Sequence, residues 1–101
     1  MKELYFHGSK NDIQGDLRKG TCVTRSKPYA LYYARRKQQG ACYIYTLLLD
    51  PAADLKPHVD AAGTVDNRLV RDTPFFERVL VTPELILEHK AALAAARAEL
   101  S

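Results

Sequence analysis

Apolar and aromatic residues form short blocks between polar, glycine-containing segments in the first quarter of the chain. Residues 4–6 (LYF) form the first block and a Gly-Ser pair follows His7, so the pattern predicts a short buried strand that ends at this histidine. Residues 8–20 (GSKNDIQGDLRKG) contain three glycines and charges of both signs. They predict a long connection, which in a small domain is usually functional. Residues 21–24 (TCVT) predict a second short strand.

The middle of the chain predicts one helix and one strongly apolar strand. Ser26 supplies a capping hydroxyl and Pro28 suits the first helical turn, so a helix is expected from there to Gln38, with Gly40 ending it. Residues 41–49 (ACYIYTLLL) are almost continuously apolar, which is typical of a strand that is buried on both faces.

The pattern weakens after residue 50. A short strand is expected at residues 54–55, residues 56–63 have the composition of a loop, and no element is assigned from there to residue 74. Residues 75–81 (FFERVLV) alternate in part and predict another strand. Residues 82–84 (TPE) then open a helix that is expected to continue into the alanine-rich tail.

Composition adds limits to this picture. The 101 residues, 47% of them hydrophobic and 27% charged, suit one globular domain spanning residues 1–101. The net charge of +3 is spread along the chain, so it tolerates a nucleotide or nucleic-acid partner without demanding one. Two cysteines and no apolar leader favour free thiols in the cytoplasm. Residues 43–49, the longest apolar run, are too few to span a bilayer, and the cysteines and histidines lack the spacing of metal ligands.

Three segments that occur in a fixed order form a more specific pattern than any one alone. They are LYFHGS at residues 4–9, GTCVTRSKPYALYYA at residues 20–34 and FERVLVTPELI at residues 76–86. Together they resemble the signature regions of the diphtheria-toxin-like ADP-ribosyltransferases with the H-Y-E triad, which include the poly-ADP-ribose polymerases and compact rifamycin-modifying transferases. The resemblance implies a compact α+β fold in which two small antiparallel sheets, flanked by helices, enclose a cleft for NAD.

The resemblance also implies roles for particular residues. His7 would bond an adenosine-ribose hydroxyl, the Gly8 backbone would hold the nicotinamide carboxamide, and Ser9 belongs to the same cofactor-binding motif. Tyr32 falls where the family places the aromatic ring that stacks on nicotinamide. Glu77 matches the glutamate that bonds the nicotinamide-ribose 2′-hydroxyl and favours an oxocarbenium-like centre as nicotinamide leaves. A histidine that is neutral near pH 7 and a fixed carboxylate facing developing positive charge suit these tasks.

Two positions have rivals and one departs from the pattern. If the register of this helix against the family motif is shifted, so that a different helix face borders the cofactor, Tyr29 or Tyr33 takes the role of Tyr32. Asp66, in GTVDNRL at residues 63–69, is the acidic residue if the loop of the rifamycin-modifying group is the better match, although the strand context favours Glu77. Cys22 stands where the family motif has a tyrosine, which leaves one wall of the nicotinamide pocket without an aromatic ring.

The implied activity is that of an NAD-dependent ADP-ribosyltransferase. The enzyme would cleave the nicotinamide N-glycosidic bond and transfer ADP-ribose to a protein, a nucleic acid, a small molecule or water, and a partner protein or a second copy could complete the site. Arg18, Lys19 and Arg25 flank the second strand and are candidates for binding the pyrophosphate. Two alternatives are an RNA 2′-phosphotransferase of the same fold and a non-catalytic module that binds a nucleotide or a partner.

Overall fold

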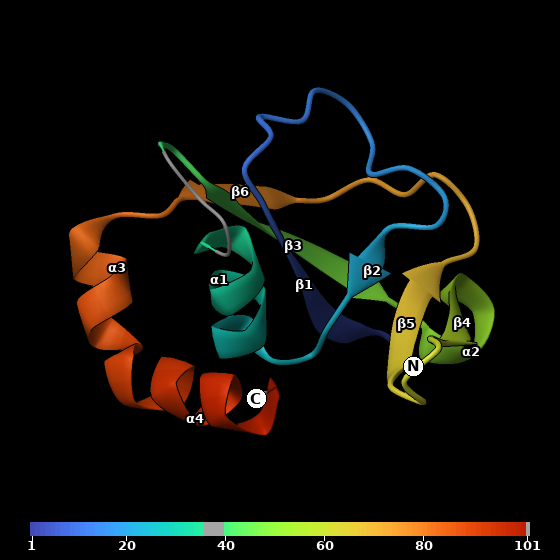
Figure 1. Ribbon diagram of the computed structural model, residues 1–101. Helices are drawn as coiled ribbons and strands as arrows, with labels where there is room; N and C mark the ends of the chain where they lie inside the picture. The colour runs from blue at the N-terminus through green and yellow to red at the C-terminus, as the bar shows by residue number, and fades with distance from the viewer. Residues whose placement is uncertain (36–39, 101) are drawn as a thin grey trace.

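A computed structural model describes residues 1–35 and 40–100 of the chain (Figure 1). Within these residues, strands and helices follow one another in the order β1 (Glu3–Ser9), β2 (Cys22–Val23), α1 (Lys27–Arg35), β3 (Tyr43–Leu49), α2 (Pro51–Asp54), β4 (Leu55–Val59), β5 (Val65–Leu69), β6 (Glu77–Leu80), α3 (Pro83–Glu88) and α4 (Lys90–Leu100).

The most apolar segment forms the middle of the first sheet, as its composition predicts. β3 lies between β1 and β6, and both neighbours are antiparallel to it. Ile44, Tyr45 and Leu47 are fully buried, whereas Leu48 is half-exposed. Both faces of β3 therefore contribute to the core along most of the strand, as expected for a central strand that is covered on two sides, and Leu48 near its end is the exposed exception.

β1 is longer than its apolar block predicts. It continues through His7, Gly8 and Ser9, and these three residues pair with Tyr45, Ile44 and Tyr43 of β3. His7 therefore lies inside the strand and not at its end. Backbone pairing with β3, the most apolar strand of the chain, outweighs the low strand propensity of glycine and serine.

The second sheet has the order β2-β5-β4 and is also antiparallel. The prediction of a loop at residues 56–63 is wrong for residues 56–59, which belong to β4, and β5 was not assigned at all. Most side chains of β4 and β5 are exposed or partly exposed, so these strands lack the apolar alternation from which a strand can be recognised. They are held by pairing with each other and with β2.

Among the described residues, one antiparallel bridge joins the backbones of the two sheets. The backbone of Phe6 in β1 bonds that of Thr24 just after β2, with N···O distances of 2.7 and 2.9 Å. On one side of β1 a core cluster joins the sheets, and on the other side a second cluster joins β1 and β3 to α1. The first cluster consists of Tyr5, Leu17, Val23, Tyr45, Leu47, Leu49 and Leu69, and the second of Ala30, Leu31, Ala34, Cys42 and Ile44.

α1 packs very closely on β1, and this contact explains a glycine. A Cβ atom at Gly8 would lie only 1.8 Å from the backbone oxygen of Ala30, so this position has no room for a side chain. The helix begins as predicted, since the Ser26 hydroxyl accepts the Tyr29 N–H at 3.3 Å. The predicted end near residue 38 lies outside the described residues.

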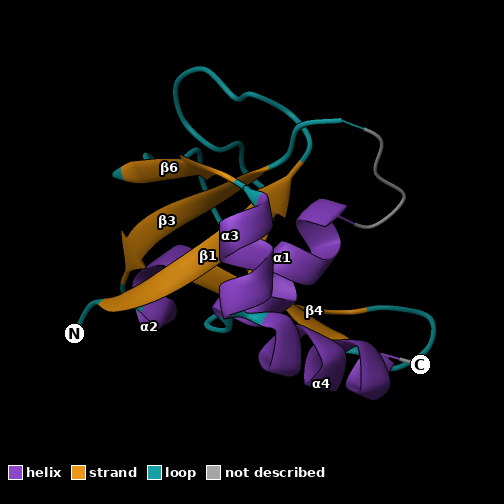
Figure 2. Ribbon diagram, turned by 90° about the vertical axis from the view of Figure 1, so that its left-hand side faces the viewer, coloured by secondary structure: helices purple, strands orange, loops and turns teal. Residues whose placement is uncertain are grey.

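The C-terminal segment forms two helices where one was expected. The Thr82 hydroxyl caps α3 as predicted, accepting the Leu85 N–H at 3.2 Å. The helix ends at His89, whose backbone (φ −106°, ψ 14°) leaves the helical region, and α4 continues in a new direction. α4 lies against α1, and α3 lies outside the first sheet on the same side as α1 (Figures 1 and 2).

The fold class predicted from the sequence is confirmed at the level of an α+β protein with two small antiparallel sheets and flanking helices. Among the residues that the structure describes, no helix combines the length and apolarity that crossing a bilayer requires.

Candidate functional site

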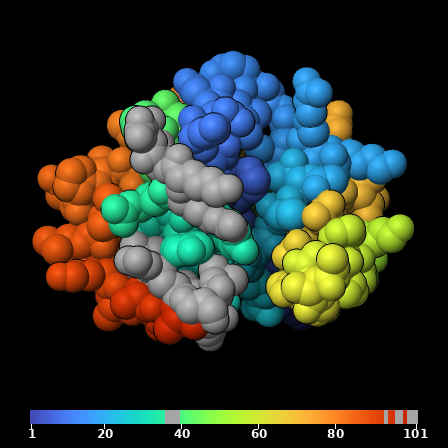
Figure 3. Space-filling model, viewed as in Figure 1, coloured from blue at the N-terminus to red at the C-terminus, as the bar shows by residue number. Residues whose placement is uncertain are grey.

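A cleft of about 640 Å³ opens where β1 and β2 separate beyond their single bridge. α1 forms one wall, and β2 with the start of β5 forms the other. In Figure 3, α1 (teal) and the β4–β5 hairpin (yellow-green) are separate bodies on the same face of the molecule. The cleft is lined by Phe6, His7, Gly8, Cys22, Val23, Thr24, Arg25, Tyr29, Ala30, Tyr33, Thr64, Val65, Asp66 and Asn67.

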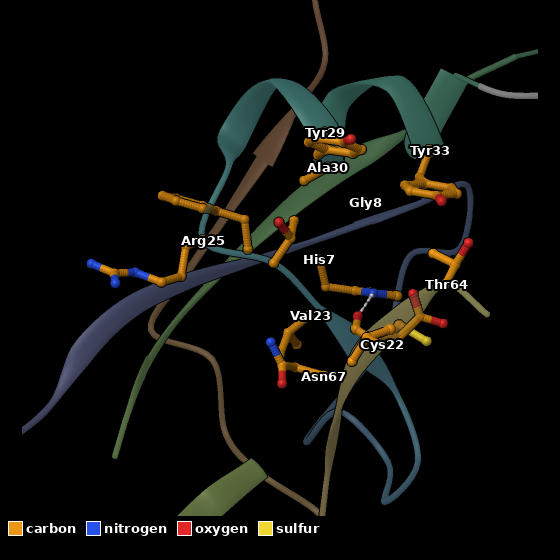
Figure 4. A pocket seen from close by; sticks show the side chains of 14 residues that line it. His7, Gly8, Cys22, Val23, Arg25, Tyr29, Ala30, Tyr33, Thr64 and Asn67 are labelled. Atoms are coloured by element: carbon orange, nitrogen blue, oxygen red, sulfur yellow. Dashed lines mark hydrogen bonds between the residues drawn. The ribbon is translucent and has the colours of Figure 1, made fainter. Parts of the chain in front are cut away.

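His7 spans the gap between β1 and β2. Its Nδ1 lies 2.8 Å from the backbone oxygen of Cys22 (Figure 4). Burial lowers the pKa of the His7 imidazole below its usual 6.5, and the bond to the Cys22 carbonyl offsets this only in part. The ring is therefore neutral at pH 7. A neutral ring that donates from Nδ1 keeps Nε2 as an acceptor for a ligand hydroxyl.

Gly8 and Ser9 follow His7 but differ in their relation to the cleft. Gly8 lines it, and the close approach of α1 to this glycine brings the helix over β1. Ser9 does not line the cleft. Its hydroxyl accepts the Asn11 N–H at 3.0 Å and so organises the start of the connection between β1 and β2.

Two of the three tyrosines of α1 face the cleft. Tyr29 and Tyr33 are one helical turn apart and both line the cleft, and the Tyr33 ring extends from α1 on the side where His7 lies (Figure 4). Tyr32 does not line the cleft; it packs on the second core cluster and meets the Tyr33 ring edge-to-face, with centroids 5.7 Å apart. The structure thus places the two rival tyrosines in the same cleft as His7, and Tyr32 packs against the Tyr33 ring from outside the cleft.

The two candidate acidic residues lie at opposite ends of one row of side chains. Glu77 pairs with Thr46, and Thr46 pairs with Phe6, which in turn bridges to Thr24. Extending the β2–β5 register by one residue places Thr24 opposite Asp66.

Glu77 and Asp66 are therefore separated by four strand spacings, about 19 Å along the sheets, so they cannot serve the same reacting atom. Asp66 lines the cleft, whereas Glu77 is exposed on β6 beyond it. The acidic residue that sequence analysis ranked second is the one that lines the cleft together with His7.

The predicted cationic residues are divided. Arg25 lines the cleft, but its guanidinium lies 3.4 Å from Glu3 and turns away from His7 (Figure 4). Arg18 and Lys19 belong to the β1–β2 connection and do not line the cleft; the Lys19 N–H bonds the Asp72 carboxylate at 2.8 Å. Cys22, at the position where an aromatic ring was expected, does lie in the cleft with an exposed side chain.

Sequence analysis did not identify Thr64, Val65 or Asn67 as candidates, although they line the cleft at the start of β5. The connection between β1 and β2 has an anchor that was also missed. The buried Tyr45 hydroxyl accepts the Ile13 N–H at 2.7 Å and donates to the Asn11 carbonyl at 2.5 Å. A tyrosine in an otherwise apolar strand is the signal that could have indicated it, because a buried hydroxyl needs partners.

Within residues 1–35 and 40–100 no group of histidine, cysteine, aspartate and glutamate side chains is arranged to hold a metal ion. No protein-family model, curated protein or solved structure matches the chain. The function is therefore argued from the cleft itself and from the sequence pattern.

Proposed function

We propose that the cleft binds NAD and that the protein is an ADP-ribosyltransferase. The observation that carries this proposal is the convergence of His7, the pair Tyr29 and Tyr33, and Asp66 from three distant segments into one cleft. A hydroxyl acceptor, aromatic rings and a carboxylate match the three chemical parts of a nicotinamide nucleoside: its ribose hydroxyls, its flat base and its cationic glycosidic centre.

The size and the walls of the cleft suit such a ligand. Its volume of about 640 Å³ lies within the range of about 300–1,000 Å³ that is usual for cofactor and substrate sites. Tyr29 or Tyr33 can stack on the nicotinamide ring, an interaction worth about 0.5–1.5 kcal/mol beyond burial of area. His7 Nε2 can accept a hydrogen bond from a ribose hydroxyl, and the Gly8 backbone can approach the carboxamide closely.

Asp66 takes the acidic role in this proposal. When the glycosidic bond breaks, its electron pair goes to the nicotinamide nitrogen, which becomes neutral, and positive charge develops on the ribose. A carboxylate held beside that carbon stabilises the developing charge. Removing one such preorganised group typically lowers a rate by about 10²–10³. The acceptor then forms a bond to the same carbon and loses its proton to solvent.

Binding and turnover are measured together to test the proposal. NAD at about one hundred times its dissociation constant should stabilise the folded protein by about 2.7 kcal/mol, which is several degrees in melting temperature for a chain of this size. The purified protein should also release free nicotinamide from NAD, and mass spectrometry of an incubated cell lysate should locate the added ADP-ribose. An unchanged melting temperature at millimolar NAD contradicts the proposal.

A second candidate is a non-catalytic module that binds a nucleotide. The exposed Cys22 thiol in the cleft favours it, because one wall lacks the expected aromatic ring. A melting shift with NAD and no nicotinamide release would assign the protein to this class. Adding 2′-phosphorylated RNA to the same assay tests the phosphotransferase alternative, because that reaction consumes NAD only when the phosphate is present.

A further inference from the structure

Arg68 lies on β5 directly after the cleft-lining residues Asp66 and Asn67, and its own side chain is not among those that line the cleft. It is two residues from Asp66, so both side chains extend from the same face of the strand. Its direct cross-strand partners are Cys22 on β2 and Lys56 on β4. Cys22 and Asp66 both line the cleft, and side chains opposite each other on paired strands have Cβ atoms about 5 Å apart.

This face of the second sheet is turned toward the α1 side of the molecule. Phe6 packs with the residues of α1, its bridge partner Thr24 shares that face, and Cys22 and Arg68 follow by alternation. The opposite face carries Val23 and Leu69, which are buried in the first core cluster. Arg68 therefore extends from the face that adjoins the cleft.

The guanidinium of Arg68 makes little use of its donors within the fold. Among the described residues its one ionic partner is Asp66, at an N···O distance of 3.9 Å, which is beyond hydrogen-bond range. Its Nε is buried and has no hydrogen-bond partner there. Three other arginines are already paired: Arg25 with Glu3, Arg71 with Asp54, and Arg78 with Asp12.

The same side chain is partly held in place. Its Nε atom is buried while the whole side chain remains 38% exposed. The part of the side chain next to the guanidinium is therefore held by the fold, and the terminal nitrogens reach solvent. Fixing a long side chain before binding lowers the entropy that is lost when a ligand is bound. An arginine with unused donors in a fork geometry is suited to two parallel bonds with a phosphate.

We propose that Arg68, assisted by Lys56, binds a phosphate group at the edge of the cleft, next to Asp66. This inference rests on the proposed function for the identity of the ligand: the phosphate belongs either to the pyrophosphate of the dinucleotide or to a phosphorylated acceptor. It places the anion on β5, next to Asp66, and not on Arg18 or Arg25. The positive charge of Arg68, 3.9 Å from the Asp66 carboxylate, also offsets the repulsion between that carboxylate and a phosphate bound nearby.

Titration calorimetry on the intact protein tests this assignment, with NAD, ADP-ribose, adenosine, inorganic pyrophosphate and a 5′-phosphorylated oligonucleotide as ligands. Arg68→Gln should weaken the binding of phosphate-bearing ligands by about tenfold to a hundredfold and leave adenosine unchanged. Lys56→Gln should have a smaller effect in the same direction. Arg71→Gln is the matched control, because Arg71 is an exposed arginine that bonds Asp54 and the Ala53 carbonyl away from the cleft.

The ligands separate the possible results. Weaker binding of ADP-ribose assigns Arg68 to the dinucleotide, and weaker binding of pyrophosphate and the oligonucleotide alone assigns it to an acceptor phosphate. If NAD does not bind the unmodified protein but pyrophosphate binds and is lost in Arg68→Gln, the proposed function fails and the phosphate site stands. If Arg68→Gln melts like the unmodified protein and binds every ligand equally well, the assignment is overturned. Should Arg68→Gln fail to fold, Arg68→Lys can be measured in its place. Lysine keeps the positive charge but lacks the two parallel N–H donors of the guanidinium, so this variant should still weaken phosphate binding.

Discussion

The two sides of β1 differ in how the neighbouring strand is attached. On one side all seven residues of β1 pair with β3, and the space above this ladder is filled by α1 and the second core cluster. On the other side the backbone of β1 bonds the chain just after β2 at the bridge between Phe6 and Thr24, and beyond it the His7 side chain spans the gap to the Cys22 carbonyl. A complete ladder of paired residues leaves no room for a ligand, whereas a single bridge leaves an opening that side chains only partly fill. The β3 side of β1 is therefore the closed side of the molecule, and the β2 side is the open side.

This difference decides between the two acidic residues. Glu77 lies on the β3 side, two strand spacings from Phe6, where the sheet is continuous. Asp66 lies the same number of spacings away on the β2 side, where the cleft opens. A sequence motif describes the immediate surroundings of a residue, but which side of β1 that residue reaches depends on the pairing of the strands.

Replacing each acid in turn gives the largest expected contrast between the two sides. Asp66→Asn should lower the rate of nicotinamide release by about 10²–10³, because the amide has nearly the same shape but no charge to stabilise the transition state. The loss should fall on kcat more than on KM, since the interaction is made mainly in the transition state. Steady-state assays of nicotinamide release measure both constants.

Glu77→Gln is the matched control on the closed side and should leave both constants unchanged. The opposite result, with Glu77→Gln inactive and Asp66→Asn active, would show that the first sheet carries the chemistry and that the cleft described here is not the active site. Equal rates of nicotinamide release by both variants and the unmodified protein would show that neither carboxylate carries the chemistry, whereas the absence of release from all three would favour the binding module.

The closed side can be tested through Gly8. Gly8→Ala places a Cβ atom 1.8 Å from the Ala30 oxygen, so α1 must move away from β1. We expect a loss of about 3 kcal/mol in the free energy of unfolding, at the upper end of the usual effect of overpacking. Ser9→Ala on the same strand removes one hydrogen bond, to the Asn11 N–H, and should cost about 1 kcal/mol. Urea unfolding of the two variants compares them, and equal stabilities would contradict the close contact.

The sequence predicted the closed side of the molecule better than the open side. β3 and β1 are rich in apolar and aromatic residues, and Ser26 and Pro28 mark the start of α1, so local pattern suffices for these elements. β4 and β5 carry mostly exposed or partly exposed side chains without apolar alternation, and they form through strand pairing, which no local pattern indicates. The residues that these strands contribute to the cleft were therefore missed or ranked low.

The candidate site follows the same division. His7, Gly8 and Arg25 were predicted from short motifs and do line the cleft. The choice among three adjacent tyrosines needs the rotation of α1 about its axis, which is set by the packing of Ala30 and Ala34 against Gly8. The resemblance of the sequence segments could not supply this rotation, because the side chains of neighbouring helix residues point in directions about 100° apart.

The tyrosines test which face of α1 borders the open side. Tyr33→Ala should weaken NAD binding by about tenfold, the combined effect of lost stacking and lost apolar area. Tyr32→Ala should mainly lower the melting temperature, because that ring packs on the second core cluster and against Tyr33. Calorimetric titration and thermal unfolding of both variants separate the effects. Normal NAD affinity in both Tyr33→Ala and Tyr29→Ala, with loss in Tyr32→Ala, would show that the helix presents a different face.

The smallest expected effect is the dependence of stability on pH, which arises at the opening between β1 and β2. Burial holds the pKa of His7 below 6.5, so between pH 6.5 and the lower folded-state value the unfolded chain binds more protons than the folded protein. The free energy of unfolding should therefore be constant above pH 6.5 and fall as the pH decreases below it. Asp54 acts in a separate pH range. The Asp50 N–H and Arg71 lower the pKa of the Asp54 carboxyl from 3.8, so the contribution of this carboxylate to the free energy of unfolding is lost only below that pH.

His7→Asn is the control variant for the imidazole. It keeps an N–H donor for the Cys22 carbonyl and removes the titration, so the free energy of unfolding of this variant should stay level between pH 7.5 and 5. Urea unfolding at several pH values compares the two proteins, and parallel curves over this range would show that the imidazole at the opening is as accessible to protons in the folded state as in the unfolded chain.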